Sequence, residues 1–222
     1  MKKVSFIFSS VVMTAMMLSS CGSGASKEEG ASKEVTIGKQ VWMTENLNVD
    51  KFRNGDPIPE AKTDEEWKVY SNAEEAAWCY YRNDPANGEK YGKLYNWYAV
   101  NDPRGLAPVG YHIPTDEEWT ALTDYLGGEE KAGVKMKSKN GWYDNGYGTN
   151  FGTNSCGFSG FPGGGRGISG TFDSIGKYGY WWSSSEGNTF NAWHRRLYCS
   201  GGGVYRNFNY RSRELSVRCL RD

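Results

Sequence analysis

Residues 91–128, YGKLYNWYAVNDPRGLAPVGYHIPTDEEWTALTDYLGG, contain the clearest structural signals in the chain. Thr115 lies three residues before Glu118, and this spacing predicts a capping box at a helix N-terminus. Gly127 ends the pattern, because glycine adopts the left-handed C-cap conformation without a Cβ clash. Three apolar residues between these signals have the spacing i, i+3 and i+7, so they share one helix face: Trp119, Leu122 and Leu126.

Strand signals lie on both sides of this helix. The aromatic run that contains Tyr95, Trp97 and Tyr98 predicts a short, half-buried strand. Residues 35–43 predict a hairpin with Gly38 at its turn. From residue 179 onward, closely spaced strand-like segments predict an antiparallel meander.

A second capping box at Thr63 and Glu66 predicts another helix. Residues 141–170 show no sustained period of either kind, which predicts a long Gly-rich loop. Strands, helices, loops and strands therefore follow one another in separate groups. This order predicts a single α+β domain of antiparallel strands with about two helices and long Gly-rich loops.

The N-terminus has the features of a bacterial lipoprotein signal peptide. Two lysines precede an apolar run, Val4–Leu18, that is too short to span a bilayer. The run continues into Ser19-Ser20-Cys21, and Leu18 to Cys21 resembles a lipobox, in which the cysteine becomes the lipidated first residue of the mature protein. We predict a signal peptide over 1–20 and lipidation at Cys21. The alternative is an ordinary signal peptide that contains a cysteine.

The segment after Cys21 has the composition of a flexible tether. Residues 21–34 contain no apolar residue larger than alanine apart from the cysteine and repeat Ala-Ser-Lys-Glu. Residues 35–222 form the predicted domain. An acidic patch just after the lipidated cysteine resembles the surface-export signal of some Gram-negative lipoproteins, although Lys-Glu runs are common in any linker. We therefore predict a cell-envelope lipoprotein at the outer membrane, exposed on the surface and held to the membrane by its lipid anchor.

Composition restricts the classes of partner. The 222 residues contain 26 basic and 26 acidic side chains, so the chain offers no net field that would attract nucleic acid. Aromatic residues make up 15% of the chain, as in a domain whose core and surface both use tryptophan and tyrosine. Seven arginines follow Phe190, while residues 45–84 carry ten acids and five bases. We expect these two segments to pair across the fold, with an anionic glycan as the alternative partner of the arginines.

Four cysteines follow Cys21, and an oxidising compartment would allow them to form two disulfides in three possible pairings. Cys199 and Cys219 lie in the last two strand-like segments, so their pairing is our first choice. Cys79 and Cys156 would then form the second bond. The spacings are far from CxxC, which argues against zinc.

Several short motifs occur in an order typical of one family. They are Ile37-Gly38, Gln40-Val41-Trp42-Met43, Glu45-Asn46-Leu47, Tyr91-Gly92, Leu94-Tyr95-Asn96-Trp97, Pro108, Gly110-Tyr111-His112-Ile113-Pro114, Trp119, Gly157-Phe158, Gly163-Gly164, Arg166, Trp182-Ser183-Ser184 and Ser216-Val217-Arg218-Cys219. In content and order these motifs resemble the Fibrobacter succinogenes major paralogous domain over about 35–222. Ala107 is a departure, because the family often has cysteine before that proline.

The same order is similar, more distantly, to the formylglycine-generating (sulfatase-modifying) and C-type-lectin-like folds. This resemblance implies a compact α+β domain with paired N- and C-terminal strands and long loops on one side. It implies a fold and an exported location rather than an activity.

The residues give little support to an enzyme. His112 precedes the helix and His194 lies beside two arginines, and neither has a nucleophile at a recognisable spacing. Residues 157–161 (GFSGF) lack the last glycine of Gly-x-Ser-x-Gly. A divergent enzyme of the formylglycine-generating type, with Cys199 as a reactive thiol, is the alternative.

No cofactor is predicted. The Glu-Pro-Asn, Gln-Pro-Asp and Trp-Asn-Asp strings with which C-type lectins bind calcium do not occur in the sequence. Calcium remains possible only through loop carboxylates such as Asp144 and Asp173.

Binding by aromatic rings is the most specific functional expectation, because exposed rings stack on sugar faces or on apolar patches of a partner. The alternative is that about half of these rings fill the core under the loop. The sequence favours a binding or adhesion module for a glycan or a surface protein; a structural subunit of a surface assembly is a further alternative. The predicted ligand-binding residues are Trp142, Tyr143, Tyr147, Phe151, Arg166, Tyr180 and Trp181.

Overall fold

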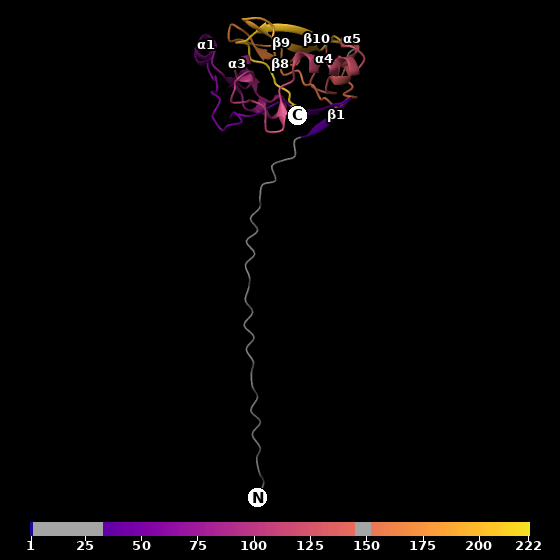
Figure 1. Ribbon diagram of the computed structural model, residues 1–222, viewed down its shortest axis with the longest axis horizontal. Helices are drawn as coiled ribbons and strands as arrows, with labels where there is room; N and C mark the ends of the chain where they lie inside the picture. The colour runs from indigo at the N-terminus through magenta and orange to yellow at the C-terminus, as the bar shows by residue number, and fades with distance from the viewer. Residues whose placement is uncertain (2–32, 145–151) are drawn as a thin grey trace. The chain divides into compact units, whose positions relative to one another are not determined.

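The folded domain contains both helices and antiparallel strands, as predicted, but they are not in separate groups, because short strands alternate with helices between residues 64 and 125. The computed structural model describes Met1, residues 33–144 and residues 152–222, and Ser32–Asp222 form one compact unit (Figure 1). In these described parts, the strands form several small antiparallel sheets, and there are five α-helices.

The first sheet brings the two ends of the domain together. Its strand order is β1 (Glu34–Ile37), β2 (Gln40–Met43), β11 (Leu220–Arg221) and β5 (Tyr111–His112), with antiparallel neighbours. The predicted hairpin is confirmed, and Gly38 has the positive φ (+64°) that its turn requires. The pairing of N- and C-terminal strands, which the family resemblance implied, is also present.

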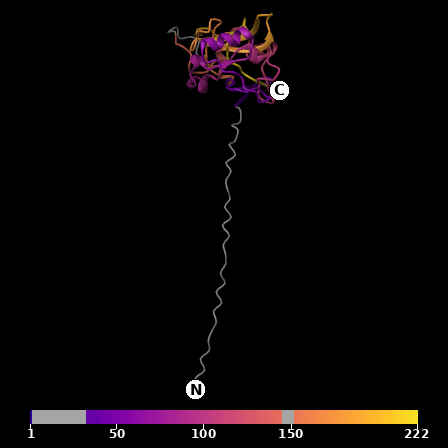
Figure 2. The same cartoon turned by 90° about the vertical axis from the view of Figure 1, so that its left-hand side faces the viewer.

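The second sheet is the predicted meander. β8 (Tyr178–Glu186), β9 (Asn191–Tyr198) and β10 (Val204–Tyr210) pair in the order β10-β9-β8. Figure 1 shows these strands along the top of the domain, with α4 and α5 beneath them; Figure 2 gives the perpendicular view. Burial falls from β8, whose central residues are buried, to β10, most of whose residues are exposed.

The outer edge of β10 is partly capped by its own side chains. The backbone N–H of Phe208 donates to Asn207 Oδ1 at 2.8 Å, and that of Tyr210 donates to Asn209 Oδ1 at 3.1 Å. These N–H groups therefore have partners although no further strand pairs with this edge among the described residues.

Two shorter sheets complete the described strands. β3 (Trp78–Cys79) pairs with β4 (Leu94–Tyr95), and β6 (Gly165–Arg166) pairs with β7 (Phe172–Asp173). The strand predicted through Trp97 and Tyr98 is wrong beyond Tyr95. The side chain of Asn96 accepts a hydrogen bond from Ala99 N and starts the short helix α3 (Trp97–Val100).

Both predicted helices are confirmed with their capping boxes, α1 (Asp64–Ala73) from Thr63 and α4 (Asp116–Tyr125) from Thr115. Two further helices, α2 (Ala86–Tyr91) and α5 (Glu129–Met136), were not predicted. Their N-caps, Pro85 and Gly128, make no side-chain capping hydrogen bond. A 3₁₀ turn, η1 (Tyr81–Asn83), follows β3.

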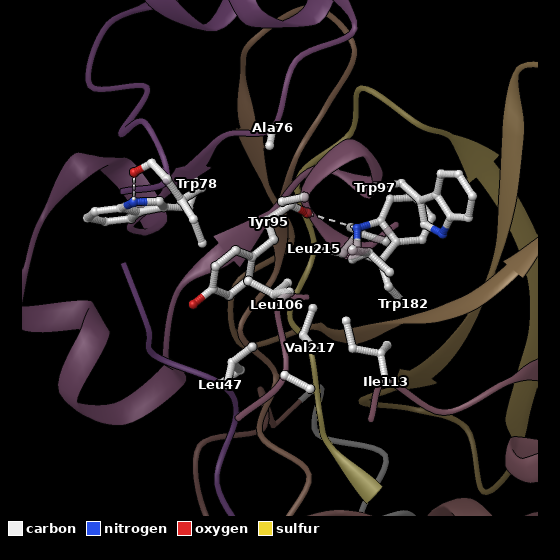
Figure 3. Packing of buried hydrophobic residues seen from close by; sticks show 14 of the residues in the cluster. Leu47, Ala76, Trp78, Tyr95, Trp97, Leu106, Ile113, Trp182, Leu215 and Val217 are labelled. Atoms are coloured by element: carbon white, nitrogen blue, oxygen red, sulfur yellow. Dashed lines mark hydrogen bonds between the residues drawn. The ribbon is translucent and has the colours of Figure 1, made fainter. Parts of the chain in front are cut away.

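The hydrophobic core has two main parts that meet at β8. Trp182 belongs to the first part, where its indole N–H donates to Tyr95 O at 2.8 Å (Figure 3). Trp181 points the other way, into the second part. That second part contains Trp42 and Trp119, whose ring centroids are 4.7 Å apart. β8 is thus covered on both faces, which explains its near-continuous burial.

None of the described helices has the length and apolar character needed to cross a bilayer.

Candidate functional site

The structure does not gather the predicted ligand-binding residues on one surface. Trp181 is fully buried and Tyr180 is 6% exposed, so both contribute to the core and not to a ligand surface. Trp142 is half-buried beside Lys137, and Tyr143 is 57% exposed. Tyr147 and Phe151, like the predicted lipidation site Cys21, lie outside the described residues.

Arg166 is also buried, and its role is structural. Its guanidinium contacts Glu214 Oε2 at 3.4 Å and Asp64 Oδ1 at 3.0 Å, and it donates to the carbonyls of Ala61, Thr63 and Gly170. Burial raises the pKa of Glu214 to about 7, although Arg166 opposes this shift. This cluster ties α1, β6 and the segment before the C-terminus together.

The predicted disulfides are not formed. Cys79, Cys156, Cys199 and Cys219 are free thiols. Cys199 follows β9 of the meander, whereas Cys219 precedes β11 of the other large sheet. The Cys79 thiol donates to Glu214 Oε2 at 3.1 Å, and the Cys156 thiol donates to Lys135 O at 3.2 Å. The thiols therefore serve separate packing sites. The predicted pairs rested on strand-like sequence positions that do not become neighbours in one sheet.

We expect reduction to leave the stability of the protein unchanged, because the four thiols form no disulfide. Urea unfolding of residues 22–222 with and without dithiothreitol should give the same midpoint. Burial raises the pKa of Cys219 to about 12, so this thiol should react with Ellman's reagent only after denaturation. A loss of ~2–4 kcal/mol on reduction would show instead that structural disulfides exist.

The expected pairing of the C-terminal arginines with residues 45–84 is wrong for the described residues. Arg195 and Arg206 bind Asp116 at the N-terminus of α4, and Arg218 donates to the uncharged Asn46. The remaining ion pairs of this region are Arg211–Glu186, Arg213–Asp173 and Arg221–Glu34. These pairings follow from sheet packing, which sequence separation did not predict.

The two histidines have different surroundings. Burial, reinforced by Arg213, Arg196 and Arg195, lowers the pKa of His194 to about 3. Partial burial opposes ionisation of His112, but its hydrogen bonds to Asp222 (2.8 Å) and Glu118 (3.0 Å) outweigh burial and raise its pKa. His112 therefore links the chain end to the α4 cap.

A groove of about 480 Å³ lies where the segment after β2 faces α2. Phe161, from the Gly-rich stretch, lines it as the one aromatic ring. The remaining lining residues are Thr44, Glu45, Asn46, Asn48, Ala86, Gly88, Glu89, Lys90 and Gly92.

Asn46 fixes one wall of the groove. Its Oδ1 accepts hydrogen bonds from the buried Arg218 (2.7 Å) and from Trp181 Nε1 (2.8 Å), and its Nδ2 donates to Tyr91 O (2.8 Å). Gly92 has φ +71°, and a Cβ there would lie 2.7 Å from Leu47 O. Only glycine therefore allows this close approach.

The polar groups at the rim remain available to a ligand. Glu45 is exposed, and within the described parts of the chain its one ion pair is with the exposed Lys33, at 2.6 Å. Glu89 and Lys90 are exposed on α2, and the Lys90 ammonium lies 5.9 Å from the Phe161 ring centroid. A half-buried ring beside two carboxylates and an ammonium can contact the C–H face of a sugar and hydrogen-bond its hydroxyls.

No group of His, Cys, Asp or Glu side chains in the described parts of the chain has the arrangement of a metal site. The carboxylate of Asp173, one of the two named for calcium, instead binds Arg213 at 3.1 Å.

Several of the motifs that resemble one family lie at the groove, and a comparison with known protein families identifies the same family. The profile of the Fibrobacter succinogenes major domain matches residues 35–221. The chain belongs to this family. Within this Fibrobacter succinogenes major domain, Glu45 and Asn46 of one motif and Gly92 of another line the groove, and Asn46 donates to the backbone of Tyr91. Comparison with curated proteins and with solved structures finds no match.

The groove was not predicted from the sequence, because these motifs indicated only membership of the family. The signal that could have indicated the groove was the polar residues of these motifs, which lie outside any predicted helix or strand.

Proposed function

We propose that this protein is a lipid-anchored binding module of the bacterial cell envelope and that its domain binds carbohydrate in the groove beside Phe161. The observation that carries the proposal is the combination of one half-buried ring with exposed carboxylates and an ammonium around a preformed cavity. Ligand sites of this kind join an apolar contact surface to a few polar groups that fix orientation.

The rigidity of the wall supports the proposal. Asn46 uses its hydrogen bonds within the protein, and the buried Arg218 that holds it also donates to Met43 O at 3.1 Å. A ligand that enters the groove therefore meets groups that are already ordered, which lowers the entropic cost of binding.

The location and fold type belong to the same proposal. The two N-terminal lysines, the apolar run that follows them and Cys21 support export and lipidation. The tether over 21–34 would let the domain reach ligands away from the membrane. Paired terminal strands, a meander and long connections support a relation to the C-type-lectin-like and formylglycine-generating folds. Surface exposure at the outer membrane, with a glycan or a surface protein as partner, completes the proposal.

We expect residues 22–222 to bind a subset of neutral oligosaccharides on a glycan array. Phe161→Ala should weaken that binding by about 10-fold or more, since a stacking ring contributes ~1 kcal/mol or more beyond simple burial. Glu89→Gln should also weaken binding, because it replaces a charged hydrogen-bond acceptor. Titration calorimetry with the best oligosaccharide gives the affinities.

Two variants provide matched controls. Phe190→Ala removes a 67% exposed ring away from the groove, and Glu117→Gln changes an exposed carboxylate on α4. Equal binding by Phe161→Ala and the wild type would place the ligand elsewhere. No binding across the array, with all variants folded, would favour a structural subunit of a surface assembly.

A further inference from the structure

A second candidate site lies on one face of the meander, away from the groove. The strand register places Tyr178 opposite Tyr198, and Arg196 opposite Tyr205. Because side chains alternate between the faces of a sheet, these four side chains occupy the same face. We call them the tyrosine–arginine face.

Arg196 lies between two tyrosine rings. Its guanidinium carbon is 5.2 Å from the ring centroid of Tyr178 and 5.1 Å from that of Tyr205. The rings of Tyr178 and Tyr198 stack at 4.6 Å with an interplanar angle of 12°. Contacts with the π-systems of the rings hold the guanidinium of Arg196 in one place, so its position does not require a carboxylate.

Arg196 lacks the ion pair that its neighbours have. Arg195, Arg206 and Arg213 each contact a carboxylate within 3.1 Å, whereas no carboxylate of the described residues lies within ion-pair distance of Arg196. Its Nε is buried without a hydrogen-bond partner. The half-buried guanidinium thus carries a positive charge that the described protein does not neutralise.

Charges of both signs lie near Arg196, because Arg195 and Arg213 are close to the neighbouring His194 while Glu129 and Glu130 line a pocket with Tyr205. Burial lowers the pKa of His194, and the nearby Arg213, Arg196 and Arg195 lower it further, so this histidine stays neutral. Lys177 is exposed next to Tyr178 and forms no ion pair among the described residues. Tyr205 is 43% exposed on the outer strand, which leaves this face open to solvent.

We propose that the tyrosine–arginine face is a second binding site, specific for the carboxylate groups of an acidic polysaccharide. The terminal N–H groups of a guanidinium form a planar fork that matches a carboxylate, and Arg196 is only half-buried. The hydroxyls of Tyr178, Tyr198 and Tyr205 can donate to and accept from sugar hydroxyls. This site is independent of the groove and takes a different class of sugar.

The test uses polygalacturonate as the probe and residues 22–222 as the protein. We expect the wild type to bind polygalacturonate, more weakly as salt increases, and to prefer it over uncharged dextran. Arg196→Gln should weaken binding about 10-fold or more, since hydrogen bonds between charged groups are the strong ones. Arg196→Lys, which keeps the charge but loses the planar fork, should bind with intermediate affinity.

Arg82→Gln is the matched control, because Arg82 is exposed near the Tyr81 ring elsewhere in the domain. Phe161→Ala should leave polygalacturonate binding unchanged, which separates this site from the groove. If Arg196→Gln lowers the melting temperature, Tyr205→Ala on the exposed outer strand should reproduce the loss of binding without unfolding.

Three results would overturn the proposal. The first is equal binding of polygalacturonate by folded Arg196→Gln and the wild type. The second is equal affinity for dextran sulfate or poly-glutamate, which would leave only charge attraction. The third is tighter binding of a single-stranded oligonucleotide, which also combines anionic groups with rings that stack on tyrosine.

Discussion

Trp181→Ala should lower the free energy of unfolding by about 3–5 kcal/mol, the range for deletion of a large aromatic side chain from a core. The Trp181 ring is fully buried and lies 5.7 Å from the ring of Phe158. Its Nε1 also donates to Asn46 Oδ1 at 2.8 Å. The substitution therefore leaves a cavity and removes one hydrogen bond from the groove wall. Urea unfolding followed by circular dichroism measures the change.

Tyr143→Ala is the control for this variant. Tyr143 is another of the aromatic residues predicted to bind ligand but is 57% exposed, so its removal should change stability by about 0.5 kcal/mol or less. A stable Trp181→Ala protein that had lost only its ligand would contradict the core position of this ring and restore the ligand surface predicted from the sequence.

Asp116→Ala should be similarly destabilising, by about 3–5 kcal/mol at neutral pH. Asp116 is 6% exposed; its carboxylate contacts Arg195, which is fully buried, and accepts from Arg206 Nε at 2.8 Å. Alanine would leave the charge of Arg195 without its carboxylate inside the protein. The main cost is the burial of an unpaired charge. In the wild type, the attraction between Asp116 and Arg195 offsets part of the free energy needed to bury Arg195, and the substitution removes this attraction.

The measurement is again urea unfolding, with Glu117→Ala as the control on the exposed side of the same helix turn. The double variant Asp116→Leu/Arg195→Met should recover part of the loss, since it removes both charges together. If the single and double variants were equally destabilised, the cost would come from packing and not from an unpaired charge.

Local signals in the sequence were sufficient for the elements that carry their own start and stop residues. The capping boxes at Thr63 and Thr115 fix the beginnings of α1 and α4, and Gly38 fixes the β1–β2 turn, because these interactions occur between residues close in sequence. The meander is predictable for the same reason, since its strands are neighbours along the chain.

The environment of a side chain could not be predicted in this way. Tyr180 and Trp181 resemble exposed binding aromatics in sequence, but β8 is covered on one face by the segment that contains Leu215 and on the other by α4. Those contacts join residues far apart in the chain. The same limit applies to the cysteines and to the arginine partners, whose proximity depends on which sheet each segment joins.

Only individual residues of the groove, and not their arrangement, could be identified from the sequence. Asn46 and Gly92 stood out as motif residues, yet the side chain of Asn46 is held by Arg218, near the other end of the domain. Similarly, Arg196 is one of seven arginines after Phe190, and nothing local in the sequence distinguishes it from those that are paired.

The amide capping on β10 affects how the exposed edge of the meander can meet other molecules. Strands that display several exposed aromatic rings at the edge of a sheet usually invite a strand from another molecule, and such additions lead to fibres. Here Asn207 and Asn209 already occupy the N–H groups of Phe208 and Tyr210, two of the donors that an incoming strand would need. These two caps therefore make a further strand harder to add at this edge, although Tyr205, Phe208 and Tyr210 stay exposed.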